Sequence, residues 1–203
     1  MHSPIRDIRE KQPEALHDRA MDNLRYIRQA MERSGSFTHV SGIGGVGMGS
    51  LAIGAAALAW NASTTAEWLA IWLVAAGASL AVSVLAMARK SAADGVTLLT
   101  GPGRKFAWSV TPPLAAGGVL TIALVRAGAF DLLPGMWLLL YGAAIVTGGS
   151  HSVRSIPFMG AAFMAAGVGA LLTPASWGDV WMAVGFGVLH IVFGALIWRK
   201  HGG

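Results

Sequence analysis

The 203-residue chain contains no cysteine, and only 12% of its residues are charged. Without cysteine there can be no disulfide, thiolate metal site or cysteine nucleophile. Soluble domains carry about 25% charged residues, so the low charge content argues against a soluble domain. Hydrophobic residues make up 54% of the chain, and its 27 glycines follow no collagen-like period. Such a composition suits helices that pack closely together in lipid.

Charged side chains are also absent from the middle of every long apolar run. The last run, 180–198, begins beside Asp179, ends at Arg199-Lys200 and contains 19 residues. At about 1.5 Å per residue, such a helix matches a hydrocarbon core of roughly 30 Å. We therefore predict an all-α polytopic membrane protein whose six transmembrane helices form three sequential hairpins. The predicted spans are 41–60, 68–88, 106–125, 133–149, 156–172 and 180–198.

Basic residues are distributed very unevenly around these spans. Fourteen of the 15 lysines and arginines precede the first span, follow the last span, or lie in the connections 88–105 and 148–155. Only Arg126 falls on the other side. By the positive-inside rule, both termini are expected to be cytoplasmic. No signal-peptide core occurs in 1–35, so the first span is expected to direct insertion. Because the lysines and arginines cluster at the ends of the spans, they argue for the lipid bilayer as a partner and against nucleic acid.

The three hairpins share a loose repeat. A tryptophan at the outer face leads to an arginine at the inner face in each one: Trp68 to Arg89, Trp137 to Arg154 and Trp181 to Arg199. Because every hairpin enters and leaves on the same side, the three can be related by a pseudo-threefold axis along the membrane normal.

Residues 1–35 are expected to form a cytoplasmic unit that precedes the transmembrane domain 36–203. Within 13–34, apolar side chains recur at spacings of three and four: Leu16, Ala20, Leu24, Ile27 and Met31. This periodicity predicts an amphipathic helix of about five turns. The helix either lies on the membrane surface or against the inner face of the bundle, or docks a partner protein.

The start of the first span resembles a nucleotide-binding motif. Residues 42–47 match G-x-G-x-x-G, but no strand precedes them and an apolar run follows, which is the wrong context for a dinucleotide site. Ser41, Gly45 and Gly49 predict instead a ridge of small residues for close helix contact. No cofactor is predicted.

Two adjacent prolines, Pro112 and Pro113, interrupt the third span. Proline lacks a backbone donor and clashes with the preceding turn. Either the helix kinks there, as a packing feature or as a hinge, or it begins at Pro112 with residues 104–111 along the interface. The hydroxyls of Ser109 and Thr111 are placed to satisfy the freed carbonyls.

Four polar residues are expected at the bilayer midplane: Ser50, Ser79, Tyr141 and His190. His190 shares a helix face with Gly187 and Gly194, so it should face another helix. It is a packed side chain bonded to a hydroxyl such as Tyr141 or Ser79, a substrate or proton site, or a haem ligand. No second histidine lies at that depth to complete bis-histidine ligation.

Polar residues also gather at the expected cytoplasmic mouth. They are His151 and Arg154 with the flanking serines, together with Arg104 and Lys105. Such residues contact lipid headgroups, or hold a phosphate or carboxylate. Paired carboxylates, Ser/His/Asp arrangements and metal-ligand spacings are not evident, so no catalytic or metal-binding residue is predicted.

Two stretches resemble a known group of proteins. Residues 21–28, MDNLRYIR, continuing through 31–33, and residues 185–194, GFGVLHIVFG, with Gly202-Gly203, are similar to a family of uncharacterised bacterial six-span membrane proteins. The resemblance implies a bacterial inner-membrane location and no activity or site residue. The tryptophan-led, glycine-rich hairpins also resemble HdeD-like acid-resistance membrane proteins.

The absence of acidic or basic residues deep in any span weakens active transport more than passive or structural roles. The favoured function is a non-catalytic membrane module, a sensor, scaffold or accessory subunit with a cytoplasmic docking helix, which also leaves room for a homo-oligomer. One alternative is a small transporter or channel for a neutral or weakly polar solute, with His190 and Tyr141 along its path and the proline pair as hinge. Another is a haem- or quinone-linked redox subunit.

Overall fold

The computed structural model describes residues 19–27, 39–97, 101–150 and 152–201. The chain separates into two compact units, 1–35 and 36–203. In the first unit, residues 19–27 are helical and exposed, and Arg25 donates a 3.0 Å hydrogen bond to Asp22 one turn earlier. The rest of the amphipathic helix predicted for 13–34 lies outside the described residues.

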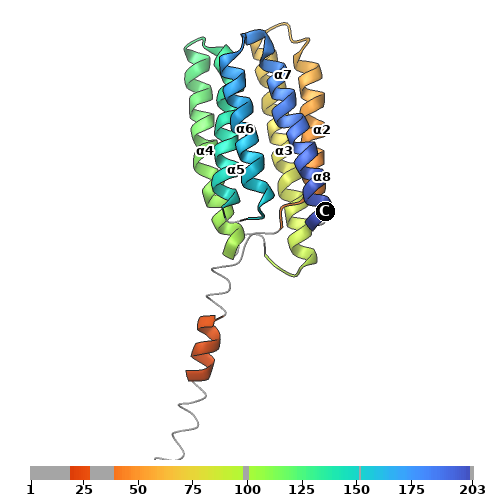
Figure 1. Cartoon of the computed structure of the whole chain (residues 1–203). Coiled ribbons are helices and arrows are strands. Elements are labelled where there is room, and N and C mark those ends of the chain that lie inside the picture. Colours follow the sequence, from red (N-terminus) through yellow and green to blue (C-terminus); the bar gives the residue numbers. More distant parts are fainter. Residues whose placement is uncertain (1–18, 28–38, 98–100, 151, 202–203) are drawn as a thin grey trace, which may run out of the picture. The chain divides into compact units, whose positions relative to one another are not determined.

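The second unit is an all-α bundle (Figure 1). Its described part includes six helical segments that are long and apolar enough to cross a membrane. The first five are α2 (Gly42–Ala59), α3 (Thr65–Ala93), α4 (Gly101–Arg126), α5 (Leu133–Gly149) and α6 (Ser155–Leu172). The sixth joins α7 (Gly178–Met182), the π-helix η3 (Ala183–Leu189) and α8 (His190–His201). Short 3₁₀ turns, η1 (Phe130–Leu132) and η2 (Ala175–Trp177), precede α5 and α7. The predicted class, an all-α polytopic membrane protein, is confirmed.

Capping residues fix where the first hairpin begins and turns. The Ser41 hydroxyl accepts a 3.1 Å bond from the Gly44 amide at the start of α2. The Thr64 hydroxyl does the same for the Glu67 amide at the start of α3, and the Glu67 carboxylate accepts from the Ser63 amide at 2.8 Å. These bonds satisfy first-turn donors that lack a partner within the helix.

The connection after α3 is shorter than predicted. Residues 88–105 were predicted as one connection between spans, but α3 continues to Ala93 and α4 already begins at Gly101. The prediction was wrong because Arg89-Lys90 and Arg104-Lys105 mark the edge of the apolar region, and charged residues do not end a helix. Helix α3 ends before Gly95, whose φ of 66° favours glycine.

Helix α4 contains both prolines in its interior. The alternative that the helix begins at Pro112 is therefore wrong. Because Pro113 has no N–H, the Ser109 carbonyl loses its usual helical donor. Thr147 of α5 lies with its hydroxyl oxygen 3.1 Å from that carbonyl oxygen, although two carbonyls of its own helix compete for the same hydrogen. Two residues earlier in α4, Thr111 donates to the Ala107 carbonyl at 2.8 Å.

Two antiparallel glycine seams hold the bundle together. In the first, a β-carbon built on Gly160 of α6 would lie 2.7 Å from the Gly142 carbonyl oxygen of α5, and Gly135 faces Gly167 in the same register. In the second, α2 packs on the sixth segment through five glycines: Gly42 and Gly45 lie opposite Gly194, and Gly49 lies opposite Gly187. The predicted ridge of small residues along α2 is confirmed at Gly45 and Gly49.

Glycines spaced seven residues apart lie almost two full turns apart, on one face of a helix. Without side chains on that face, the two backbones of each seam can approach to direct contact. Both seams join helices of different predicted hairpins. The closest helix contacts therefore lie between hairpins. The predicted pseudo-threefold arrangement of hairpins does not say which helices make these contacts.

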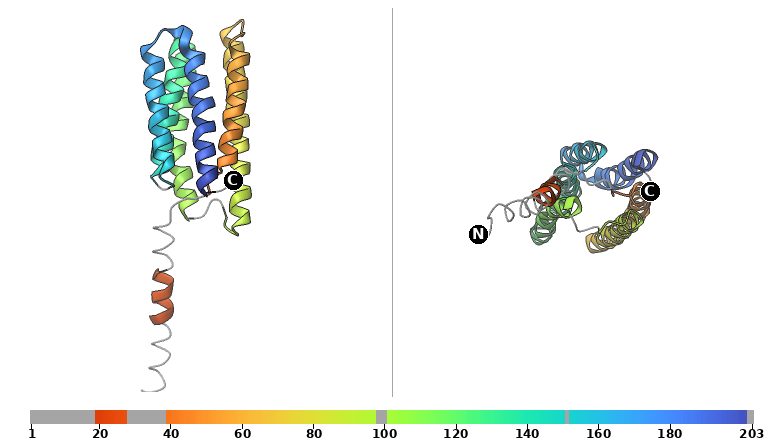
Figure 2. Two further views of the ribbon diagram at one scale, coloured as in Figure 1. Left: turned by 45° about the vertical axis from the view of Figure 1, so that its right-hand side comes forward. Right: turned by 90° about the horizontal axis from the view of Figure 1, so that it is seen from below.

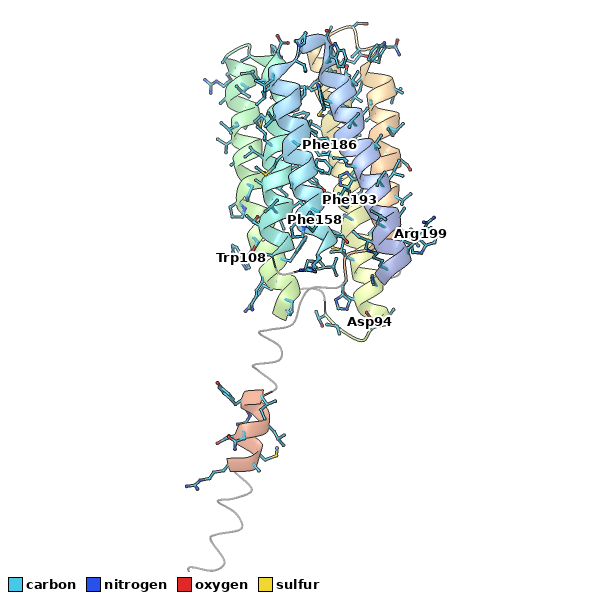
Figure 3. All side chains as sticks on the ribbon, viewed as in Figure 1. Asp94, Trp108, Phe158, Phe186, Phe193 and Arg199 are labelled. Atoms are coloured by element: carbon cyan, nitrogen blue, oxygen red, sulfur yellow. The ribbon has the colours of Figure 1, made fainter. Side chains whose placement is uncertain are left out.

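Helices α3 and α4 lie at the edges of the bundle (Figure 2). Helix α3 packs chiefly on α2, and α4 chiefly on α5. Their spanning windows are only 6% buried, compared with 33–39% for the other four segments. Most of their apolar surface therefore faces away from the rest of the chain, as Trp108 of α4 does in Figure 3.

Candidate functional site

His190 and Tyr141 form a hydrogen-bonded pair inside the bundle. The Tyr141 hydroxyl oxygen lies 2.7 Å from His190 Nε2, and His190 Nδ1 lies 2.9 Å from the Phe186 carbonyl oxygen. A carbonyl can only accept, so Nδ1 carries the proton; in the neutral ring Nε2 then accepts from the tyrosine. Both ring nitrogens and the hydroxyl are thus satisfied, although His190 is only 4% exposed.

Aromatic rings fill the space around this pair. The rings of Tyr141 and Phe163 are 4.8 Å apart, and those of Phe163 and His190 are 5.1 Å apart. Phe186, labelled in Figure 3, is half-buried and stacks on His190 with ring planes inclined by 19°. These tilted and stacked contacts are favourable for aromatic groups. Because they leave His190 almost without exposed surface, they weigh against a solute path along the pair.

Of the four residues expected at the midplane, the structure brings together Tyr141 and His190. Ser50 is exposed on α2, and its hydroxyl donates a 2.9 Å bond to the Val46 carbonyl of its own helix. Ser79 is half-buried on α3 and takes no part in the bonds of the pair. His190 does face another helix, as predicted, but that helix is α5, whereas Gly187 and Gly194 on the same segment approach α2.

A second polar group lies where α3, α5 and α7 begin; we call this end of the bundle the tryptophan end. Trp68 donates a 2.6 Å hydrogen bond from Nε1 to Asp179 and stacks on Trp137 with ring centroids 5.6 Å apart. Trp137 in turn donates to the Thr121 hydroxyl, and Trp181 donates to that of Thr173. These indole donors therefore tie neighbouring segments together, in addition to anchoring the bundle at an interface.

The opposite end of the bundle, where α2 begins and α8 ends, carries the basic residues of the helix termini. Arg104 and Lys105 lie in the first turn of α4, and Arg154 precedes α6; all three are exposed. A β-carbon on Gly148 would lie 3.0 Å from the Phe106 ring, so the start of α4 packs beside the end of α5. The role of the three basic residues as a headgroup or anion contact stays a prediction. His151, the fourth residue of the predicted contact, lies outside the described residues.

One contact at this end was not predicted from the sequence. His39 Nε2 lies 3.1 Å from Asp94 Oδ2, and Lys90 donates a 3.2 Å bond to the Val40 carbonyl. Together they fasten the segment before α2 to the end of α3. These contacts could not be predicted from the sequence, because the two partners of each contact are about 50 residues apart and neither belongs to a motif.

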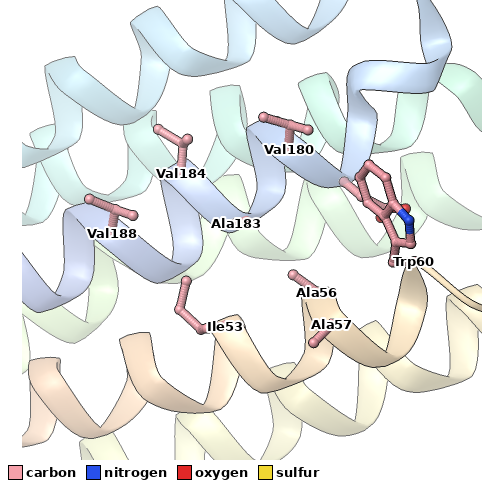
Figure 4. A pocket seen from close by; sticks show the side chains of 9 residues that line it. Ile53, Ala56, Ala57, Trp60, Val180, Ala183, Val184 and Val188 are labelled. Carbon is pink, nitrogen blue, oxygen red and sulfur yellow. The ribbon is translucent and has the colours of Figure 1, made fainter.

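A groove of about 500 Å³ lies between α2 and the α7–η3 segment (Figure 4). Its walls are apolar side chains, and Trp60 and Asp179 lie at its tryptophan end. The lining residues are Ile53, Ala56, Ala57, Trp60, Asp179, Val180, Ala183, Val184 and Val188. His190 and Tyr141 do not line it. Part of the wall is the π-helix, a form that is rare and often found at functional sites.

Among the described residues, no group of three or more His, Asp or Glu side chains is placed to hold a metal ion. The six apolar spans make the chain an integral membrane protein in contact with the lipid bilayer. No family of known proteins, no curated protein and no solved structure matches the chain. The resemblance to uncharacterised bacterial membrane proteins therefore stays a prediction.

Proposed function

We propose that this chain is a non-catalytic membrane module that works as a sensor, scaffold or accessory subunit in a bacterial inner membrane, with both termini in the cytoplasm. The observation that carries this proposal is the hydrogen bonding of the His190 side chain inside the bundle. It is the only ionisable side chain besides Tyr141 that the sequence places deep in a span, and both its nitrogens are engaged in packing bonds. A group bound in this way supports the position of α5 against the sixth segment, and offers no free atom to a substrate.

The exposed apolar faces of α3 and α4 support the same proposal. Leu73, Val74 and Leu80 of α3 are 51–72% exposed, and Val119 and Ile122 of α4 are 68% and 63% exposed. Surfaces of this kind contact lipid or the transmembrane helices of a partner. Lipid-facing surface of this kind is common to polytopic membrane proteins, and a scaffold or accessory subunit also uses it to contact partner helices.

The helical residues 19–27 supply the cytoplasmic contact in this proposal. Leu24 and Ile27 belong to the predicted stripe and are 61% and 52% exposed. Replacing both by glutamate is expected to abolish partner recovery, because a charge in an apolar contact is costly. The matched control adds two glutamates off the stripe, at Tyr26 and Gln29. Recovery is measured by quantitative co-purification from native membranes in mild detergent.

The control variant should retain the partner that the stripe variant loses. If the wild type repeatedly recovers no partner, and deletion of residues 1–34 changes neither membrane integrity nor growth, the docking proposal is wrong. Equal loss in both glutamate variants would point to general disruption of the helix and would also contradict a contact through the stripe.

The purified protein is expected to be colourless. Haem ligation needs a free imidazole nitrogen, and in His190 each nitrogen already has a partner within 3 Å. The measurement is the absorption spectrum of protein purified from cells supplied with haem precursors. A Soret band that disappears in His190→Leu would contradict the packing role and favour the redox alternative.

A further inference from the structure

The groove between α2 and the α7–η3 segment matches one leaflet of a bilayer in length. It runs from Trp60 back to Ile53 on α2, and from Asp179 to Val188 on the opposite wall. At about 1.5 Å per residue these stretches cover about 10 to 14 Å. Half of a hydrocarbon core of roughly 30 Å is about 15 Å. The groove therefore extends from the membrane interface almost to the midplane, parallel to the helices.

The walls of the groove suit a hydrocarbon chain. Ile53, Val180, Val184 and Val188 are 37–45% exposed, so they face the bilayer rather than the protein core. Between them the floor consists of the alanines 56, 57 and 183, whose short side chains leave the depression open (Figure 4). In a membrane this space is filled by acyl chains, because no water or polar group can occupy it favourably.

The tryptophan end of the groove is polar and negatively charged. Asp179 lines it, and among the described residues Trp68 is the one hydrogen-bond donor to that carboxylate. A carboxylate has about four lone-pair sites, so it can accept further N–H donors. Trp60, which is 66% exposed, adds an aromatic face at the same end. A carboxylate and an indole ring that line the same end of a groove offer the chemistry that attracts an ammonium group.

We propose that this groove is a binding site for a phospholipid with a primary ammonium headgroup, of the phosphatidylethanolamine class. One acyl chain lies along the alanine floor, and the ammonium donates hydrogen bonds to Asp179 next to Trp60. A quaternary choline has no N–H to donate, and an anionic glycerol headgroup is repelled by the carboxylate. The site is separate from the His190–Tyr141 pair and does not depend on the proposed function.

Native mass spectrometry of the full chain tests this site. The detergent-purified protein is titrated with dioleoyl phosphatidylethanolamine, phosphatidylcholine or phosphatidylglycerol, and bound lipid is counted. The wild type is expected to bind one phosphatidylethanolamine about tenfold more tightly than either other lipid, as one charge-assisted hydrogen bond allows. Asp179→Asn keeps an acceptor for Trp68 but should reduce this preference to about twofold or less.

Ala57→Phe tests the acyl channel, because a ring on this exposed floor position occupies the space of the chain. It should weaken binding of all three lipids about tenfold or more. The matched controls are Asp131→Asn and Ala123→Phe, exposed positions of the same residue types outside the groove. Both should bind lipid as the wild type does. Equal binding of the three lipids by the wild type, a preference for phosphatidylcholine, or unchanged binding in Ala57→Phe would each overturn the proposal.

Discussion

Replacing Gly160 by alanine is expected to lower the free energy of unfolding by about 1–3 kcal/mol. The added β-carbon would lie 2.7 Å from both the Gly142 carbonyl oxygen and the Val146 amide nitrogen of α5. Both are backbone atoms, so no side chain can rotate away to relieve the contact. Helix α6 must move off α5, and the contacts along the seam weaken together. Unfolding by SDS titration in mixed micelles, followed by tryptophan fluorescence, measures the change.

Gly118→Ala in α4 is the matched control, because a β-carbon there meets nothing within 4 Å. Alanine is a better helix former than glycine by about 0.5–1 kcal/mol, so this variant should be neutral or more stable. The two substitutions are chemically the same, and the predicted effects have opposite signs. A Gly160→Ala protein as stable as Gly118→Ala would show that the α5–α6 seam does not hold the bundle.

Replacing Gly194 by alanine in the second seam, between α2 and the sixth segment, should also lower the free energy of unfolding. A β-carbon on Gly194 would lie 2.7 Å from the Val46 amide nitrogen and 2.9 Å from the Gly42 carbonyl oxygen. The two seams join different helices, so the losses in Gly160→Ala and Gly194→Ala should add within about 0.5 kcal/mol.

The positions of the spans could be read from the sequence because the bilayer imposes length and composition on each helix. Helix α5 begins and ends at the predicted residues, 133 and 149, since Pro134 suits a first turn. Helix α3 was predicted too short, because the hydrophobic window ends at the charges while the helix goes on to Ala93. Membrane thickness thus determines the apolar part of a helix and leaves its ends to capping residues and glycines.

The pairing of helices was harder to predict, although part of the signal was present. Glycines recur every seven residues at 135, 142 and 149, at 160 and 167, and at 187 and 194, a spacing that places them on one helix face. Such a spacing identifies the face and does not say which helix covers it. The π-helix at Ala183–Leu189 left no mark in the apolar pattern, because every side of that segment is apolar or small.

The candidate site could also be predicted only in part from the sequence. Depth along the membrane normal follows from counting residues, and it correctly placed Tyr141 at the level of His190. Depth says nothing about the direction in which a side chain leaves its helix, so Ser50 and Ser79 were grouped with the pair although neither bonds to it. The sequence places Asp179 at the border of the last span, whereas its position with Trp60 at one end of a groove required the packing of α2 against α7.

Breaking the hydrogen bond between Tyr141 and His190 is expected to cost about 1–2 kcal/mol of unfolding free energy. Tyr141→Phe removes the donor and leaves Nε2 buried without a partner, and a buried unsatisfied group costs about 1–3 kcal/mol. Hydrogen bonds between membrane helices average about 0.6 kcal/mol and reach about 1.7 kcal/mol, so the lower part of that range applies. His190→Leu leaves the Tyr141 hydroxyl unsatisfied among aromatic rings and should cost a similar amount.

The double variant decides between a packing pair and two independent groups. Replacing both partners by apolar side chains removes the unsatisfied atoms as well as the bond, and this can be nearly neutral. The Tyr141→Phe/His190→Leu protein should therefore be at least as stable as either single variant, with a coupling energy of about 1–2 kcal/mol in SDS titration. Additive losses would show that the two side chains do not stabilise each other. A double variant that is stable yet no longer binds the partner recovered by the wild type would show that the pair is needed for partner binding and not only for packing.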